Sequence, residues 1–186
     1  MFVPHALSRE ECQAIVVEGG VGWEPTKITK AGYERPGVTV GAVSNPAVRS
    51  ADHAELGPEG SVPVADRVLD LAIQANEREF GFTLTGMLPN DAMSILRYDH
   101  RASGHFSIHQ DLGASFSTRK LSLSVQLSED SAYEGGDLVF PYANDRGPRS
   151  IGTLAIFPSY LPHYVTTVTS GRRYALVGWI HGPAFR

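Results

Sequence analysis

The sequence has a single cysteine, Cys12, among its 186 residues. One cysteine cannot form an intrachain disulfide, and it cannot supply the ligands of a cysteine-based zinc or iron–sulfur site. We therefore expect a fold that does not depend on an oxidising compartment, and a cytoplasmic protein. For Cys12 itself we predict packing in the core, because the sequence reveals no neighbour that would stabilise a thiolate.

Long hydrophobic runs are also missing, and no stretch approaches the length of a membrane span. Residues 1–5 lack the basic segment and following apolar run of a secretory signal. With 16 basic and 20 acidic side chains, the formal net charge of -4 argues against a broad nucleic-acid-binding surface. We expect neither a membrane nor a nucleic acid among the partners.

The second half of the sequence is rich in short strand patterns separated by Gly, Pro, Asn or Asp. These patterns lie at residues 92–98, 106–109, 121–127, 137–140, 153–157, 163–168 and 174–180. Many short strands of this kind are typical of a sandwich or jelly roll. A hydrophobic content of 42% suffices for one core. We predict a mostly β protein with flanking helices and one domain, 1–186, in which residues 1–85 form N-terminal helices and edge strands around a jelly-roll core in 86–186.

The first half of the sequence favours helices. Ser8 and Glu11 have the spacing of a capping box, so a short helix should follow and end at the left-handed glycines near 19–20. Residues 23–43 mix β-branched side chains with Gly and Pro, which indicates irregular strands and loops. From Pro63 to Phe80 apolar side chains recur at helical spacing, with the proline suited to the first turn. We predict that this helix covers one face of a sheet as a support layer.

Four residues of the second half have the chemistry of an iron site with an anchor for a keto acid: His109, Asp111, His163 and Arg173. Two imidazoles and one carboxylate form a facial triad, which leaves adjacent positions on Fe(II) open for an organic co-substrate and O2. On a strand, residues i and i+2 point to the same face, so His109 and Asp111 can reach one metal. Arg173 offers a permanently charged fork for a carboxylate, which would be the remote end of 2-oxoglutarate.

A second His-x-acid motif, from His53 to Glu55, shows how weak the motif is when it stands alone. The adjoining Gly57 and Pro58 indicate a loop. The motif therefore fails the joint requirement for a strand and a basic anchor that His109 meets, and we predict no metal site there.

The segment 121–127 alternates apolar residues with serine and glutamine, so one face should pack and the polar face should line the site. Two further side chains are candidates for substrate contact. Arg119 follows the metal strand in an expected loop, where the alternative is a solvated surface charge. Trp179 lies on the same face of an extended strand as Arg173, where it either walls the pocket or packs in the core.

Several local stretches carry a family likeness: Ser94–Tyr98, Arg119–Ser122, Tyr133–Leu138, and Phe157–Ser159 continuing through His163 to Gly171–Arg173. Together they resemble the 2-oxoglutarate and Fe(II)-dependent dioxygenases of the prolyl-4-hydroxylase-like group. The resemblance spans the second half of the chain, with a weaker match at the N-terminus. It implies a double-stranded β-helix and assigns iron binding to the triad and co-substrate binding to the late arginine.

The resemblance also implies that Tyr98 and Gln126 lie beside the co-substrate. The family often has a tyrosine at the end of the strand before the metal strand, as Tyr98 is here. Relatives often carry an aromatic residue at the position of Gln126, so this chain departs from the pattern there.

The implied cofactors are Fe(II), 2-oxoglutarate and O2, with ascorbate as an additional candidate. The implied reaction is hydroxylation of an unactivated C–H bond, with a prolyl residue of a protein or peptide as the first choice of substrate. A free amino acid or small metabolite is the alternative substrate. Two other classes stay open: a cupin-like metalloenzyme that does not use 2-oxoglutarate, and a non-catalytic binding module with the same fold.

Overall fold

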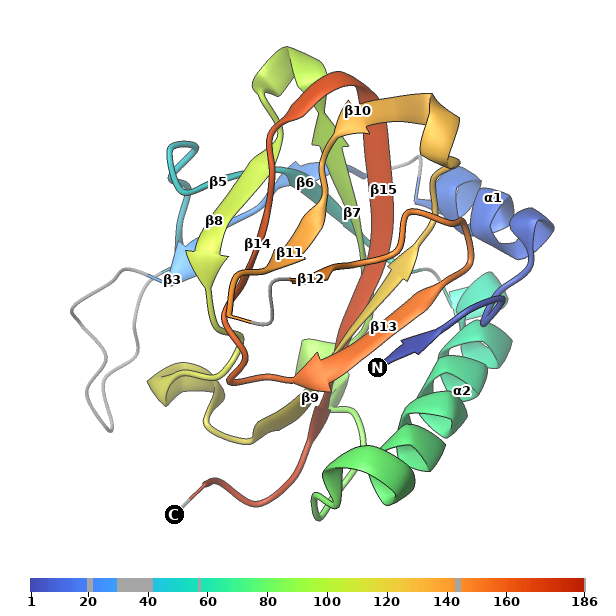
Figure 1. Cartoon of the computed structure of the whole chain (residues 1–186), viewed down its shortest axis with the longest axis vertical. Helices are drawn as coiled ribbons and strands as arrows, with labels where there is room; N and C mark the ends of the chain where they lie inside the picture. Colours follow the sequence, from blue (N-terminus) through green and yellow to red (C-terminus); the bar gives the residue numbers. More distant parts are fainter. Residues whose placement is uncertain (20–21, 30–41, 57, 143–144, 186) are drawn as a thin grey trace.

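Two antiparallel sheets lie face to face, with two α-helices on the outer side of the larger sheet (Figure 1). The computed structural model describes residues 1–19, 22–29, 42–56, 58–142 and 145–185. The larger sheet has eight strands in the order β1-β13-β9-β15-β7-β6-β2, with β10 paired to β15. Their bounds are β1 Phe2–Val3, β2 Glu24–Pro25, β6 Asp52–Glu55, β7 Ser94–Asp99, β9 Arg119–Gln126, β10 Tyr133–Gly135, β13 Leu154–Pro158 and β15 Val168–His181.

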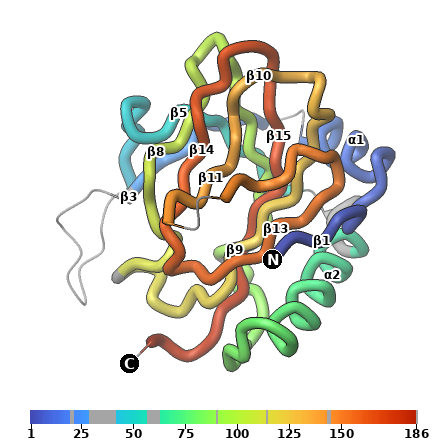
Figure 2. Tube along the Cα trace, viewed as in Figure 1, coloured from blue at the N-terminus to red at the C-terminus, as the bar shows by residue number. Residues whose placement is uncertain are grey.

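The smaller sheet has five strands in the order β12-β11-β14-β8-β5. Their bounds are β5 Arg49–Ser50, β8 His105–His109, β11 Leu138–Phe140, β12 Asp145–Arg146 and β14 His163–Val165. A separate pair is formed by β3 Ile28–Thr29 and β4 Ala42–Val43. Figure 2 shows β1 beside β13, so the first residues of the chain extend the larger sheet.

This arrangement confirms the predicted class, a mostly β jelly roll with flanking helices. All seven strand segments predicted in the second half are present, with shifted ends. The largest difference is β15, which begins at Val168, whereas we expected a strand from Tyr174. The longer strand forms because its first part has partners on both sides: Gly171 lies opposite Tyr133 of β10 and Arg172 lies opposite Asp99 of β7.

Helix α1, Arg9–Glu18, begins at the predicted capping box. The Glu11 amide donates to the Ser8 hydroxyl at 3.1 Å, and the Ser8 amide donates to the Glu11 carboxylate at 2.7 Å. Cys12 of this helix is fully buried against the sheet, and burial raises the pKa of its thiol to about 11. Cys12 is therefore the core cysteine that we expected.

Two predicted helix ends differ from the structure. Gly19 ends α1 in a right-handed conformation with φ -69°, so a left-handed turn does not explain why this residue is a glycine. The glycine is needed for space, because a Cβ there would lie 2.6 Å from the Cδ1 of Ile95. Helix α2 runs over Pro58–Ala75 and continues as a π-helical turn over Asn76–Phe80. Pro58 meets the first-turn preference that we assigned to Pro63, which instead lies inside the helix.

The two faces of β9 separate the two parts of the core. Leu121, Leu123 and Val125 pack with the helices on the outer side of the sheet. Ser124 and Gln126 line a cavity between the sheets, as the alternation predicted. The remaining interior between the sheets is apolar and is formed by Leu96, Tyr98, Tyr133, Leu138, Phe140, Ala155, Phe157, Val165 and Val168.

The motif from His53 to Glu55 lies on β6, so our expectation of a loop was wrong. The segment forms a strand because it pairs with β7 on one side and β2 on the other. His53 Nδ1 lies 3.1 Å from the carbonyl of Glu24, and no metal-ligand cluster of the described residues includes His53. Of the irregular segment expected at 23–43, residues 30–41 lie outside the described residues. Within the described residues no helix is long and apolar enough to cross a membrane.

Candidate active site

The three metal-ligand candidates meet where the ends of β8 and β14 are paired. His109 is the last residue of β8 and His163 the first of β14, and they lie opposite each other in the sheet. A register irregularity in this pairing adds a residue on the β8 side. Asp111 lies just beyond the strand, not on it as the spacing had suggested. Its amide donates to the carbonyl of Ser159 at 3.0 Å, which fixes its position after the strand ends.

Donor atoms of the three side chains converge on one point. His109 Nε2 is 3.6 Å from Asp111 Oδ1, and His163 Nε2 is 3.6 Å from Asp111 Oδ2. One donor atom from each residue lies within 4.8 Å of the others, and the described part of the chain contains no second group of three such ligands. Two imidazoles and a carboxylate in this arrangement match a metal site with open coordination positions.

Each imidazole is oriented by a backbone carbonyl two residues earlier. His109 Nδ1 lies 2.8 Å from the carbonyl of Ser107, and His163 Nδ1 lies 3.0 Å from that of Leu161. A ring nitrogen that donates to a carbonyl carries the proton, which leaves the lone pair of Nε2 for a metal. Burial lowers the pKa of His163, opposed by the Asp111 carboxylate, and neutral imidazole is the metal-binding form.

Asp111 is held as a carboxylate. Burial alone would raise the pKa of Asp111, but the two facing imidazoles, when protonated, and the Ser122 hydroxyl together lower it well below its usual range. Ser122 Oγ donates to Asp111 Oδ2 at 2.6 Å and lies 3.0 Å from Ser159 Oγ. The polar face of β9 therefore orients a candidate ligand oxygen, a role that the alternation alone did not assign to Ser122.

Arg173 lies in the interior on β15 and is 4% exposed. Its Nε donates to Gln126 Oε1 at 3.2 Å, and its Cζ lies 5.4 Å from the centre of the Tyr98 ring. The structure thus brings together the three residues to which the resemblance gave co-substrate contacts. No carboxylate of the described residues forms an ion pair with Arg173. Within the described residues the buried charge therefore stays without a counter-charge.

A small cavity lies beside Arg173, and its polar lining includes Tyr133 and Arg149, which we had not predicted as site residues. The stretch that begins at Tyr133 entered the sequence analysis only as a segment of the family likeness, without a role for Tyr133 itself. The residue in this stretch that could have indicated the site is the second glycine, Gly136. A Cβ on Gly136 would lie 3.1 Å from Arg173 Cδ, so the backbone packs closely against the arginine there. The metal-ligand candidates are not part of the lining, so the cavity marks the arginine end of the site.

Arg119 is the first residue of β9 and is 6% exposed, so both the expected loop and the alternative of a solvated charge are wrong. It is paired with Asp91, to which its Nε donates at 2.7 Å and its Nη2 donates a second bond. Its Cζ lies 3.6 Å from the ring centre of Trp179 and 3.9 Å from that of Phe116. Its Nη1 also donates to the carbonyl of Asp111 at 3.4 Å. Substrate contact by Arg119 or Trp179 stays a prediction.

Iron and 2-oxoglutarate fit the residues present. Two imidazole Nε2 atoms with free lone pairs and a deprotonated carboxylate form a donor set suited to Fe(II). Arg173 is a buried cation without an ion-pair partner among the described residues, which suits the distal carboxylate of a keto diacid.

Comparison with known proteins indicates the same two cofactors, iron and 2-oxoglutarate. Residues 93–181 match the family model of the 2OG-Fe(II) oxygenase superfamily. A PKHD-type hydroxylase from Crocosphaera subtropica is 29% identical over 140 residues, which cover 69% of this chain and 63% of that protein. This chain therefore spans less than two thirds of the length of that relative.

Solved prolyl hydroxylases have the same fold. The enzyme from Trichoplax adhaerens, solved with a peptide fragment of the hypoxia inducible factor oxygen degradation domain, has a TM-score of 0.73 at 16% identity, covering 97% of this chain and 82% of its own. The viral collagen prolyl hydroxylase from Paramecium Bursaria Chlorella virus-1, solved as a 2-oxoglutarate complex, has a TM-score of 0.67 at 16% identity. The alignment with the viral enzyme covers 98% of this chain and 96% of the viral chain.

Residues 93–181 are thus similar in sequence to the 2OG-Fe(II) oxygenase superfamily, and the chain has the fold of solved prolyl hydroxylases. The predicted resemblance to the prolyl-4-hydroxylase-like group is confirmed: the PKHD-type relative is similar in sequence, and the solved prolyl hydroxylases have the same fold. Fe(II), 2-oxoglutarate and O2 are the cofactors that this family implies.

Proposed function

We propose that this chain is an Fe(II)- and 2-oxoglutarate-dependent dioxygenase that hydroxylates an unactivated C–H bond. The observation that carries the proposal is the convergence of His109, Asp111 and His163 within 4.8 Å. The buried Arg173 supports 2-oxoglutarate as co-substrate, because a cupin-like metalloenzyme that does not use this keto acid has no need of the unpaired cation.

In this proposal the triad holds Fe(II) and Arg173 pairs with the distal carboxylate of 2-oxoglutarate. When bound, iron and 2-oxoglutarate together supply the oxidising chemistry with O2. The side chains of the protein supply position and exclusion of water. The carbonyls of Ser107 and Leu161 hold the imidazoles, Ser122 holds the Asp111 carboxylate, and the apolar interior between the sheets keeps the site dry.

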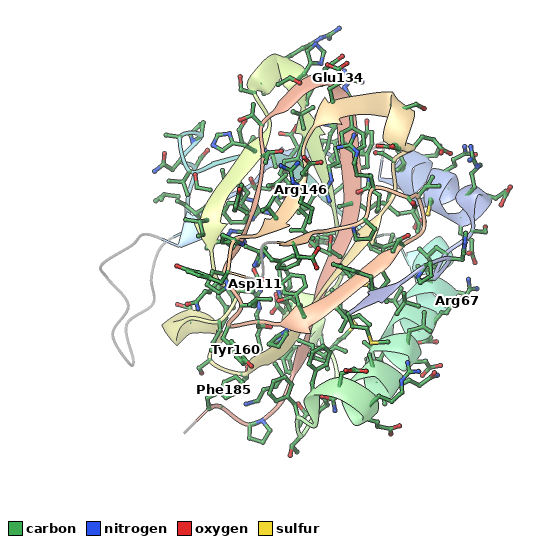
Figure 3. All side chains as sticks on the ribbon, viewed as in Figure 1. Arg67, Asp111, Glu134, Arg146, Tyr160 and Phe185 are labelled. Carbon is green, nitrogen blue, oxygen red and sulfur yellow. The ribbon has the colours of Figure 1, made fainter. Side chains whose placement is uncertain are left out.

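The proposed substrate is a prolyl residue in a protein or peptide, acted on in the cytoplasm. The peptide-bound prolyl hydroxylase of the same fold supports this choice, and the sequence relative is itself named a hydroxylase. Tyr160 is 44% exposed and follows Ser159, whose carbonyl accepts from the Asp111 amide; Tyr160 and Asp111 are both labelled in Figure 3. Exposed apolar side chains next to a site suit an extended peptide better than a small polar metabolite.

The test is turnover with defined substrates. The protein is loaded anaerobically with Fe(II) and 2-oxoglutarate and then exposed to air with proline-containing peptides, with free amino acids, or with neither. We expect succinate formation that increases with a proline-containing peptide, and a peptide product that has gained one oxygen atom. Stimulation by a free amino acid alone would instead favour the small-molecule alternative.

His163→Ala should abolish turnover because it removes a ligand, whereas His100→Ala, at an exposed histidine outside the cluster, should retain it. Absence of succinate with every substrate, in protein shown to bind iron, would contradict 2-oxoglutarate chemistry. Full activity of His163→Ala would contradict the metal site.

A further inference from the structure

Tyr133 is a buried side chain in the cavity beside Arg173. It begins β10, lies opposite Gly171 of β15 and is 4% exposed. Its hydroxyl lies 2.9 Å from Gln126 Nε2. Arg149 lies over the other side of the ring, with its Cζ 4.2 Å from the ring centre. The phenol is thus held from two directions inside a polar cavity.

The side-chain amide of Gln126 forms hydrogen bonds with three neighbouring groups. Its Oε1 accepts from Arg173 Nε at 3.2 Å, and its Nε2 donates to the Tyr133 hydroxyl at 2.9 Å and to the Ser128 carbonyl at 3.3 Å. A glutamine amide has only two N–H donors, and both are engaged. Gln126 therefore has no donor left for a carboxylate, and it links Arg173 to Tyr133.

Tyr133 and Arg173 each retain a donor. The Tyr133 oxygen accepts from Gln126, and its own proton meets no acceptor among the described hydrogen bonds. Arg173 uses Nε for Gln126 and contacts the Tyr133 side chain, and its two Nη groups meet no carboxylate among the described residues. Burial raises the pKa of Tyr133, opposed by the charges of Arg173 and Arg149, so the phenol is protonated and able to donate at neutral pH.

The charge around the cavity favours an anion. Arg149 is neutralised, because it donates to Asp137 at 2.7 Å and also pairs with Asp130. Arg173 is the buried cation without such a pair among the described residues. A neutral hydroxyl beside a guanidinium with free N–H groups is a donor set for one carboxylate.

We infer that the Tyr133 hydroxyl and the Arg173 guanidinium together bind the distal carboxylate of 2-oxoglutarate, and that Gln126 is a positioning residue that holds both donors. The inference rests on the proposed function. It assigns the second donor for the carboxylate to Tyr133 on β10, because both N–H donors of Gln126 on β9 are already engaged.

Ligand binding separates this role from simple packing. We would titrate the anaerobic Fe(II)-loaded protein with 2-oxoglutarate and with pyruvate, a keto acid that lacks the distal carboxylate, and follow the charge-transfer absorption. Tyr133→Phe should weaken 2-oxoglutarate binding about tenfold or more. It should leave pyruvate binding, Fe(II) affinity and the urea unfolding midpoint near wild type. The matched control is Tyr142→Phe, at a tyrosine that is 78% exposed, which should change none of these values.

A second variant keeps the inference testable if Tyr133→Phe folds poorly. Gln126→Glu places a carboxylate against Arg173, where it competes with the ligand. The affinity ratio of 2-oxoglutarate to pyruvate should then fall at least as much as in Tyr133→Phe, a change that loss of packing alone would not produce. Equal weakening of both keto acids by either variant would overturn the inference, as would an unchanged 2-oxoglutarate affinity in Tyr133→Phe. Failure of the wild-type protein to bind 2-oxoglutarate would overturn the proposed function as well.

Discussion

Two buried arginines lie on neighbouring strands of the larger sheet in different surroundings. Arg119 on β9 is 6% exposed and Arg173 on β15 is 4% exposed. Asp91 pairs with Arg119 through two hydrogen bonds, whereas no carboxylate of the described residues pairs with Arg173. A buried charge without a partner is costly, so Arg119 is neutralised within the fold, whereas the charge of Arg173 is the one that our proposal pairs with a ligand.

The side-chain packing differs in the same way. Arg119 lies against the rings of Phe116 and Trp179, which cover its guanidinium. Arg173 lies against Tyr98, and its one described hydrogen bond goes to a neutral amide. The comparison teaches that burial alone does not distinguish the two arginines, whereas the charge of their partners does.

Removal of the partner of Arg119 should have the largest effect on stability. Asp91→Ala leaves Arg119 buried without a counter-charge, and it also removes the carboxylate that lies 3.1 Å from His181 Nε2. We expect the free energy of unfolding to fall by about 3 kcal/mol or more in urea denaturation. Asp66→Ala, at an exposed carboxylate on α2, is the control and should change it by less than about 0.5 kcal/mol. A loss below about 1 kcal/mol for Asp91→Ala would break the comparison.

Arg173→Met should have the opposite profile. The substitution removes an unpaired buried charge, so the free energy of unfolding without ligand should stay the same or rise. Affinity for 2-oxoglutarate should fall about 100-fold, because charge-assisted bonds to the carboxylate are lost. The wild type should gain about 2.7 kcal/mol of stability from 2-oxoglutarate at 100 times its Kd, and the variant far less at that concentration.

Arg119→Met is the matched control for this experiment. It leaves Asp91 buried without its partner and should therefore destabilise the protein even without ligand. If Arg119→Met and Arg173→Met lower the free energy of unfolding equally, the proposed difference between the two arginines is wrong.

Local sequence rules predicted the elements whose determinants are close together in the chain. The capping box of Ser8 and the two faces of 121–127 are examples, because each depends on neighbours within one helix turn or one strand. The start of α2 was misplaced because Pro58 and Pro63 satisfy the same first-turn rule. His53 was assigned to a loop because Gly57 and Pro58 follow it closely. The segment is a strand because β6 pairs with β2 and β7, and these partners are distant in sequence.

The same limit applies to the site. The triad and Arg173 were recognisable because the chemistry of their residue types at that spacing is unusual. The partner of Arg119 was not, because Asp91 lies 28 positions earlier and only tertiary packing brings them together. Tyr133 was not predicted for a different reason: it follows Gln126 by only seven positions, but it lies on another strand, and the pairing of β10 with β15 accompanies the contact of its hydroxyl with Gln126.

A smaller effect should follow from Ser122→Ala, which tests how β9 supports the metal end of the site. Ser122 lies on the same strand as Arg119 and donates to Asp111 Oδ2 at 2.6 Å. Loss of this bond should weaken Fe(II) binding about tenfold, measured by anaerobic calorimetry. Ser124→Ala, on the same face of the strand but at the cavity, should leave Fe(II) affinity within about twofold. Equal effects of the two variants would show that the Asp111 contact has no special role.

The smallest effect is expected from Arg119→Lys, compared with the same change at Arg173. Lysine keeps the charge beside Asp91 but not the two-bond fork, so we expect a loss of about 1 kcal/mol in the free energy of unfolding. Fe(II) affinity should change by less than about threefold, because the bond from Arg119 to the Asp111 carbonyl is long at 3.4 Å. Arg173→Lys should instead leave stability near wild type and weaken 2-oxoglutarate binding about tenfold. If Arg119→Lys weakens co-substrate binding as much as Arg173→Lys does, then Arg119 also belongs to the ligand site and its pairing with Asp91 is not purely structural.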